Sequence, residues 1–380
     1  MCKIRFSYIL SLILHIQDDG VVKMKRFLSI ILVVVIMLIQ MTGFCGCDNK
    51  TQLEKFKAYY FDYFDTATTI IGYAKTQEEF DKTCEDIKSQ LNKYHRLFTI
   101  YNRYEGLNNL VTINDVDDDK HNVVTVDREI IDMLTFAKEM YKKTDGTVNV
   151  AMGSVLKIWH TYRNSGLDDP ANAELPPMEK LKEASKHTNI EDLIIDTENN
   201  TVFLADPEMT LDVGAIAKGY AVEKVAKHLE TKGITNFLLN VGGNVRTIGM
   251  ADTEKWKVGI ENPDLNNEEK PYIEFLKLSG ESVVTSGSYQ RFYIVNGENY
   301  HHIIDPETLM PGTKYRSVSV LTDDSGLGDA MSTALFLMDY EAGKQLVEST
   351  ENVEAMWVMP DGEQRYSSGF EAYTFEYTQK

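Results

Sequence analysis

Cysteine is scarce in this 380-residue chain, and three of its four cysteines lie within the first 47 residues. Cys84 is the only one that follows them. One cysteine can form neither an internal disulfide nor a Cys-x-x-Cys zinc or redox site in the rest of the chain. We therefore expect a fold held together by its hydrophobic core, with Cys84, which lies on an apolar helical stripe, as one of the core residues.

Several catalytic signatures are also missing from the sequence. It has no Gly-x-Ser-x-Gly elbow, no Walker loop and no His-Glu-x-x-His pair, which leaves serine hydrolases, P-loop enzymes and zincins without support. The Gly-x-Gly-x-x-Gly fingerprint of dinucleotide-binding folds is absent as well. If a dinucleotide binds to this chain, it binds to a fold of another kind.

Basic residues are far fewer than acidic ones. The chain has 39 Lys and Arg against 58 Asp and Glu, a formal net charge of −19. Such a surface repels nucleic acid and anionic headgroups, so we expect no nucleic-acid partner. An anionic ligand can bind only where cations or helix N-termini reverse the field locally, which makes the few well-placed lysines and arginines informative.

The N-terminus has the features of an export signal. Met24-Lys25-Arg26 is a short basic start, and the apolar run that follows it is too short for a comfortable membrane span. Gly46-Cys47 resembles a lipoprotein cleavage site, with Cys45 as the weaker alternative for lipidation. We expect a signal peptide at 24–46 and lipid on Cys47, with an uncleaved N-terminal anchor as the alternative. Translation is expected to start at Met24, which leaves residues 1–23 as a leader extension or a misassigned start.

The remaining chain is predicted to hold a short tether at 47–57 and one compact domain at 58–380. Strand-like and helix-like patterns alternate irregularly, which favours an α+β fold with a mixed sheet. No repeat or linker divides the domain. We expect a strand signal through 59–74, a surface loop at 160–178 and a final helix near Asp329. The other expected helices are 77–94, one around 130–141, and 215–232. The other expected strands are 190–195, 201–204, 237–241, 256–260, 272–278, 282–286, 291–295, 317–321, 356–359 and 373–377.

Two helix starts carry residues suited to a diphosphate and a metal. In the first, Asp212 and Gly214 precede the helix and Lys218 lies about one turn in, so free N–H groups and a cation could meet phosphate. In the second, Asp329 and Thr333 share a helix face, and their oxygens suit Mg²⁺. Each segment alone is explained as well by ordinary helix capping.

Three further stretches offer polar groups. Thr285-Ser286-Gly287 and the pair His301-His302 lie near predicted strands, and an imidazole can accept a proton from a hydroxyl near neutral pH. A histidine pair by itself is more often exposed at the surface or bound to a metal than part of a catalytic site. Thr147-Val148-Asn149 follows a helix end and could offer backbone and amide contacts to a base.

Taken in order, these segments resemble the FAD:protein FMN transferases of the ApbE family. The similarity covers about Tyr60 to Val347. Its most specific blocks are Asp-Val-Gly-Ala-Ile-Ala-Lys-Gly-Tyr at 212–220, Thr-Ser-Gly at 285–287, His-Ile-Ile-Asp-Pro at 302–306 and Asp-Ala-Met-Ser-Thr-Ala at 329–334. Phe64-Asp65-Thr66 stands where the family often has Met-Gly-Thr.

The resemblance implies an enzyme that uses Mg²⁺ to split FAD, releases AMP and attaches FMN to a Thr or Ser hydroxyl of a partner protein. It implies His302 as the base that deprotonates the acceptor, while the adjacent His301 leaves open which imidazole faces the site. Metal contacts would come from Ala215, Asp329, Ser332 and Thr333. FAD contacts would come from Phe64, Tyr101, Thr147, Val148, Asn149, Asp212, Lys218, Ser286, Gly287 and Ile303.

The same resemblance implies the setting. The acceptor would be a flavoprotein, such as a redox-complex subunit, and the enzyme would face the extracytoplasmic side of the cell membrane on its lipid anchor. Two alternatives stay open. One is Mg²⁺-dependent hydrolysis of FAD to FMN and AMP, and the other is a flavin-binding lipoprotein without turnover.

Overall fold

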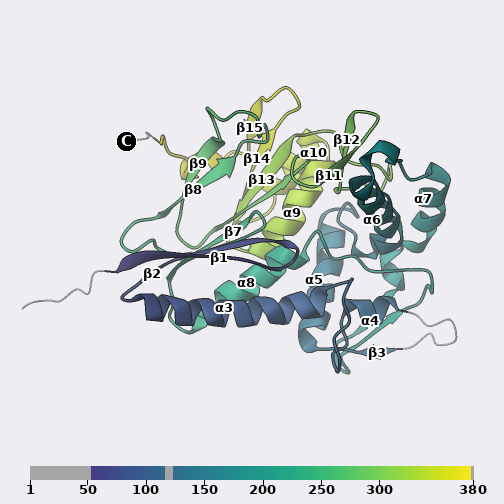
Figure 1. Ribbon diagram of the computed structural model, residues 1–380, viewed down its shortest axis with the longest axis horizontal. Coiled ribbons are helices and arrows are strands. Elements are labelled where there is room, and N and C mark those ends of the chain that lie inside the picture. The colour runs from purple at the N-terminus through teal and green to yellow at the C-terminus, as the bar shows by residue number, and fades with distance from the viewer. Residues whose placement is uncertain (1–52, 116–122, 378–380) are drawn as a thin grey trace, which may run out of the picture. The chain divides into compact units, whose positions relative to one another are not determined.

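The computed structural model describes residues 53–115 and 123–377 (Figure 1). The expected leader, Cys45 and Cys47 lie outside the described residues. The described residues from Leu53 onward form one compact unit. Strand β1 (Glu54–Tyr63) already begins inside the segment expected as a tether. No helix among the described residues combines the length and the apolar character needed to cross a bilayer.

The centre of the domain is an eight-stranded sheet in which every neighbouring pair runs antiparallel. Its strand order is β1-β2-β6-β7-β10-β13-β14-β15, so strands distant in sequence become neighbours. Together with the helices packed on it, this sheet confirms the α+β prediction, although its strands are all antiparallel where a mixed sheet was expected. Beside β1 the strands are β2 (Thr66–Ala74), β6 (Asn236–Val241), β7 (Asn244–Gly249), β10 (Ser282–Gly287), β13 (Ser317–Thr322), β14 (Val353–Val358) and β15 (Gln364–Tyr366).

Helices line one face of this sheet, as Figure 1 shows for α3 (Gln77–Phe98), α8 (Ala217–Thr231) and α9 (Ser325–Leu337). The predicted stripe of α3 is confirmed, because Phe80, Cys84, Ile87 and Leu91 are buried at a spacing of three or four residues. The opposite face is covered by the hairpin of β8 (Trp256–Glu261) and β9 (Tyr272–Leu278), whose Trp256 and Leu276 belong to the second side of the core.

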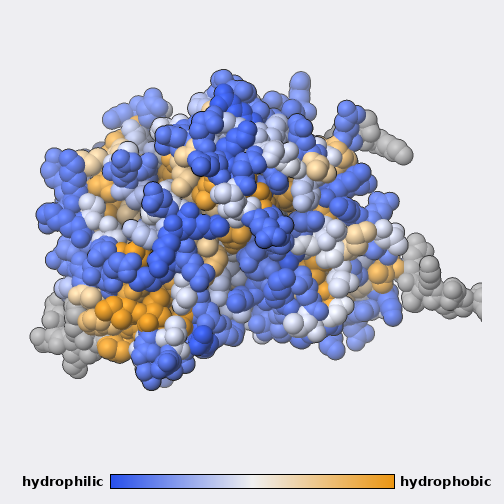
Figure 2. Space-filling model, turned by 180° about the vertical axis from the view of Figure 1, so that it is seen from behind, coloured by the Kyte–Doolittle hydropathy of each residue, from blue (hydrophilic) through white to orange (hydrophobic). Residues whose placement is uncertain are grey.

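Smaller elements surround this central unit. Three short strands form a separate sheet, and β11 (Phe292–Val295) pairs with β12 (Glu298–His301) in a hairpin beside α6 (Gly153–Asp168). On the back face of the molecule, apolar side chains gather at the end that carries α4 and β3 (Figure 2). The remaining elements are β3 (Val124–Thr125), β4 (Leu193–Asp196), β5 (Thr201–Leu204), α4 (Leu110–Asn114), α5 (Arg128–Lys143), α7 (Met178–Ala184) and α10 (Tyr340–Glu348).

The structure corrects the prediction of a surface loop at 160–178. Its first half is the end of α6, where Val155 and Trp159, four residues apart, are both buried. Glycine and proline dominated the sequence pattern, but Pro170 comes only after the helix has ended.

Three other boundaries also differ from the prediction. The stretch 59–74 is a hairpin, because Phe64 and Asp65 adopt left-handed backbone angles and reverse the chain. The last long helix begins at Ser325, capped by Asp324, so Asp329 lies inside it. The expected strand at 373–377 is a 3₁₀ turn (Phe370–Tyr373) followed by one isolated bridge at Thr374.

Candidate active site

Lys218 at the start of α8 and Asp329 in α9 are 111 residues apart in sequence and meet in the structure. The Asp329 carboxylate of α9 accepts hydrogen bonds from Lys218 Nζ at 3.1 and 3.3 Å, and its Oδ2 accepts one from the Gly219 amide at 2.8 Å. Asp329 is buried and Lys218 is half-buried. The prediction placed Lys218 one turn into its helix, but α8 begins only at Ala217. Lys218 therefore belongs to the first turn, where the positive end of the helix dipole adds to its charge.

Gly219 allows this close approach. A Cβ at residue 219 would lie 2.2 Å from the carbonyl oxygen of Ser325 and 2.5 Å from Cβ of Asp329. Any side chain would force α8 and α9 apart. The hydrogen bond from the Gly219 amide to Asp329 therefore depends on the absence of a side chain at this position.

Three hydroxyl groups gather where β10 packs against α9, the helix that carries Asp329. Ser286, near the end of β10, has its Oγ 2.9 Å from Ser332 Oγ and 3.4 Å from Thr333 Oγ1. Ser332 also donates to the Asp329 carbonyl at 3.0 Å. Ala215 lies in the turn just before α8. The structure thus brings together three of the four residues predicted as metal contacts, and it adds Ser286 to them.

The donor set fits a hard cation that keeps part of its water shell. One carboxylate and several hydroxyls are the oxygen ligands that Mg²⁺ takes when substrate phosphates supply the others. Asn244 donates to Asp329 Oδ1 at 3.4 Å, and its own buried Oδ1 has no partner among the described residues. No group of three or more His, Cys, Asp or Glu side chains that could hold a metal occurs in the described ranges. A metal here would therefore need ligands beyond the protein.

Asp212 organises the turn in front of α8. Its Oδ1 accepts from the Gly214 amide at 2.8 Å, and its own amide donates to the Val150 carbonyl at 2.8 Å. Oδ2 lies 3.8 Å from His160 Nε2. Asp212 thus links the segment that precedes the helix to the neighbourhood of Thr147, Val148 and Asn149.

The three predicted contacts at 147–149 are not equally available. Val148 is buried, and the Asn149 side chain accepts from the Ala151 amide and donates to the Thr188 carbonyl, both at 2.9 Å. The Asn149 amide is therefore engaged within the protein. Contacts from this segment to a ligand would come mainly from its main chain and from Thr147, which is half-buried.

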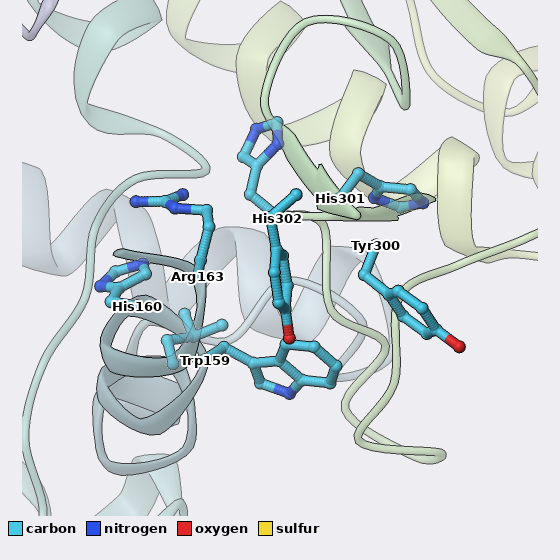
Figure 3. Close-up of a pocket in the computed structure, with 8 residues that line it drawn as sticks. Trp159, His160, Arg163, Tyr300, His301 and His302 are labelled. Atoms are coloured by element: carbon cyan, nitrogen blue, oxygen red, sulfur yellow. The ribbon is translucent and has the colours of Figure 1, made fainter. Parts of the chain in front are cut away.

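The structure separates the roles of the two adjacent histidines. His301 is buried, with its Nε2 2.6 Å from the Gly312 carbonyl and its Nδ1 accepting from the Ile303 amide at 3.2 Å. Both ring nitrogens are thus engaged inside the protein. Both histidines line a small cavity with Trp159, His160 and Arg163, but the ring of His302 points in another direction (Figure 3), and only its Nδ1 has a partner among the described residues. His302 is therefore the imidazole that faces the site.

The surroundings of His302 keep it neutral. Burial, followed by the positive charge of Arg291, lowers the pKa of His302 to about 3, and His301 and Lys218 act in the same direction. Its Nδ1 lies 3.3 Å from the Arg291 carbonyl. If Nδ1 carries the proton and donates to that carbonyl, Nε2 keeps its lone pair free. A neutral imidazole in this tautomer can act as a base.

Helix α6 contributes two residues that the sequence analysis did not select. His160 Nδ1 lies 3.3 Å from the Tyr101 hydroxyl, and Arg163 lines the same cavity as His302. Burial lowers the pKa of His160, and Asp212 opposes that change. The spacing of Val155 and Trp159 was the signal for this helix, but Gly166 near its end and the prolines beyond it favoured a loop. Tyr101 itself is largely exposed, as a predicted contact to a ligand would be.

The β1–β2 turn and the loop before β11 meet at the edge of the site. The Phe64 amide donates to His95 Nδ1 at 3.1 Å, and the Phe64 ring packs edge-on against the His95 ring. Arg291 donates through one guanidinium nitrogen to the Asp65 carbonyl at 3.1 Å. Gly287 ends β10 and the buried Ile303 follows His302, so both lie on the segments that carry Ser286 and His302.

Comparison with known proteins identifies the family. The family model described as the ApbE family matches residues 64–357. This chain belongs to the ApbE family. A protein of Klebsiella pneumoniae named FAD:protein FMN transferase is 31% identical over 69% of this chain and 81% of its own length. One of the same name from Treponema pallidum is 34% identical over 65% of this chain and 70% of its own length. These relatives confirm the expected enzyme class, a transferase.

Solved structures agree on the fold. The crystal structure of the ApbE protein from Thermotoga maritima has a TM-score of 0.73 and 26% identity, and the match covers 85% of this chain and all of that one. The flavin transferase ApbE from Vibrio cholerae has a TM-score of 0.69 at 23% identity, covering 84% of this chain and 99% of that one. The predicted fold of the ApbE family is confirmed.

Proposed function

We propose that this protein transfers FMN from FAD to a Ser or Thr hydroxyl of a partner protein and that the reaction requires Mg²⁺. Support for flavin transfer comes from the family and from the names of its relatives. The single observation that carries the mechanism is the Lys218–Asp329–Gly219 contact. It brings together a cation, a helix N-terminus and a carboxylate, which supports the proposal that a diphosphate and its metal bind here.

Each residue of the site has a distinct task in this mechanism. Lys218 and the positive end of the α8 dipole would bind the diphosphate, and Asp329 with the hydroxyls of Ser332 and Thr333 would hold Mg²⁺. Bound Mg²⁺ would neutralise the diphosphate oxygens as the bond between the phosphates breaks. Tyr101 and Asp212 lie where they would contact the remainder of FAD.

His302 would supply the base. Its free Nε2 takes the proton of the acceptor hydroxyl as that oxygen bonds to the phosphorus of the FMN half. The bond from this phosphorus to the bridging oxygen breaks, and AMP leaves with that oxygen. The products are a phosphate-linked FMN on the acceptor, AMP and one proton, so atoms and charge balance.

A direct assay separates transfer from the two alternatives. The purified full-length protein is incubated with FAD, Mg²⁺ and an acceptor, and it is then resolved on a denaturing gel for flavin fluorescence while AMP is measured by chromatography. Transfer predicts a fluorescent acceptor band and an equal amount of AMP. AMP with only free FMN would mean hydrolysis, whereas FAD binding without AMP would mean a flavin-binding protein.

We also propose that the enzyme is anchored by lipid at Cys47 and works outside the cytoplasm. Support comes from the basic start, apolar run and Gly46-Cys47 junction of the sequence. Labelling cells with a radioactive fatty acid tests this proposal. Cys47→Ala should abolish the label on the protein, while Cys45→Ala should keep it. A label that survives Cys47→Ala and disappears with Cys45→Ala would move the anchor to Cys45.

A further inference from the structure

Strand β12 borders a groove that no residue assigned to FAD or metal lines. The groove encloses about 660 Å³, within the range of ligand-binding sites. On one side it is lined by Asn299, Tyr300 and His301, the last three residues of β12. On the other side lie Thr313, Tyr315 and Arg316. We propose that an extended segment of the acceptor protein binds in this groove as an added strand beside β12.

The lining residues show that the groove follows the edge of the strand. Successive side chains of a strand point to opposite faces, so a pocket lying over one face would touch every second residue. Three consecutive residues of β12 line this groove. It therefore runs along the edge, where main-chain groups are accessible.

The hairpin turn determines which main-chain groups face that edge. Asn296 and Gly297 both have positive φ, 52° and 87°, as a two-residue type I′ turn requires. Such a turn closes on a hydrogen-bonded pair, here Val295 and Glu298, and the pairs then alternate along the hairpin. The peptide groups of Asn299 and His301 consequently point away from β11.

The outward group of Asn299, which is exposed, is available to a new strand, whereas His301 at the end of β12 is buried. Within the described residues, no main-chain hydrogen bond joins Asn299 or His301 to an element outside the hairpin, and β12 pairs only with β11. An unpaired strand edge can recruit an extended peptide through main-chain bonds, with alternating side chains entering flanking pockets. Main-chain bonds hold an extended segment whatever its side chains are. They would therefore suit an acceptor segment in which only the Ser or Thr hydroxyl has to react.

The groove also leads to the reacting groups. Strand β12 ends at His301, directly before His302. At another wall, Ser288 follows the end of β10, two residues beyond Ser286 of the hydroxyl cluster, and its amide donates to the Arg316 carbonyl at 3.2 Å. A segment in the groove would thus approach both the proposed base and the proposed phosphate site. This inference rests on the proposed function, because only transfer to a protein needs such a segment.

Two substitutions at one exposed position isolate the main-chain bond. Asn299→Pro removes the outward N–H, and proline is tolerated on edge strands. Asn299→Ala removes the side chain but keeps the N–H. The full-length protein is given FAD, Mg²⁺ and a pooled library of synthetic nonapeptides with a central threonine, and FMN attachment is followed by mass spectrometry. We expect kcat/KM for the peptides to be about tenfold lower in Asn299→Pro than in Asn299→Ala.

A second pair of variants, at a position outside the hairpin, tests the groove even if Asn299→Pro disturbs the hairpin. Thr313 is exposed on the opposite wall and none of its side-chain atoms makes a hydrogen bond to the described residues. Thr313→Trp would fill the groove while leaving the sequence of β12 unchanged. It should raise the KM for the peptides about tenfold relative to Thr313→Ser. Melting temperature and FAD affinity, the latter from flavin fluorescence, report whether the site itself is intact.

The outcomes separate this inference from the proposed function. Equal transfer by Asn299→Pro and Asn299→Ala, together with equal transfer by the two Thr313 variants, would overturn the groove and leave flavin transfer standing. A wild-type protein that releases AMP but labels neither the peptides nor any protein would overturn both. A selective loss in Asn299→Pro and Thr313→Trp, with FAD affinity retained, supports the added strand.

Discussion

The carbonyl oxygen of Arg291 lies 3.3 Å from Nδ1 of His302, and the guanidinium of the same arginine reaches the Asp65 carbonyl. Arg291 therefore touches the proposed base through its main chain and the β1–β2 turn through its side chain. Its charge also helps to lower the pKa of His302. The main-chain carbonyl stays in place in any substitution, so a variant here changes the charge and the contact to Asp65 but keeps the acceptor beside His302.

Arg291→Met should move the acid limb of the pH–rate profile to higher pH. A base works only while unprotonated, and the wild-type pKa of His302, about 3, puts that limb far below neutrality. Losing the positive charge raises this pKa, so the limb should shift upward by about one pH unit. His301, Lys218, His160 and Arg163 also face this region and remain unchanged. The measurement is kcat/KM for AMP release from about pH 3 upward, so that the acid limbs of both proteins fall within the range.

Arg291→Lys is the matched control for this shift. It keeps the charge while changing the contact to Asp65, so its acid limb should stay near that of the wild type even if the KM for FAD rises. Identical acid limbs in Arg291→Met and wild type would show that the charge does not govern the base.

Asp329→Asn should abolish turnover while preserving the fold. The amide keeps the shape of the side chain but loses the charge that would hold Mg²⁺, a contribution of several kcal/mol, so AMP release should fall on the order of 10³-fold. Asp323→Asn, at an exposed position just before α9, makes the same charge change outside the cluster and serves as the control. Wild-type AMP release by Asp329→Asn in Mg²⁺ would refute the metal assignment.

Lys218→Ala should act mainly on FAD affinity. The ammonium group contributes a charge beside the proposed diphosphate, and its loss should weaken FAD binding about tenfold or more. A flavin fluorescence titration measures this directly. Lys218→Arg keeps the charge and should bind FAD more tightly than Lys218→Ala. An unchanged dissociation constant in Lys218→Ala would mean that the diphosphate binds elsewhere.

Gly219→Ala should lower both stability and activity. The new methyl group would meet the Ser325 carbonyl at 2.2 Å, and backbone cannot move aside as a flexible side chain can. We expect a loss of about 2–3 kcal/mol in the free energy of unfolding, measured by denaturant titration.

The control for this substitution is another helical glycine. At Gly343 in α10 an added Cβ would meet only the end of the Leu335 side chain, at 3.1 Å. Gly343→Ala should be close to neutral, since the gain in helix propensity offsets a small adjustment. A Gly219→Ala protein as stable and active as Gly343→Ala would argue against close helix contact as a requirement of the site.

The sequence alone was sufficient to predict α3, α5, α8 and most strands, and it selected Lys218 and Asp329, but it missed α6 and the contacts of Gly219 and Asn244 with Asp329. The apolar stripe of α3 is a local pattern. It can be recognised in the sequence because residues three or four apart lie on one face of a helix and are buried together. The resemblance identified residues 212–220 and 329–334 as parts of one site, but it gave no distance between them.

The contact between the segments 212–220 and 329–334 could be learned only from the tertiary structure. The hydrogen bond from Gly219 to Asp329 joins residues 110 positions apart, and nothing in either segment specifies the packing of α8 on α9. The choice between His301 and His302 also depended on the Gly312 carbonyl, which returns to His301 only after the chain has turned at residues 305–310. Local sequence determines which elements form, whereas the burial of polar groups against distant partners determines which side chains remain free to react.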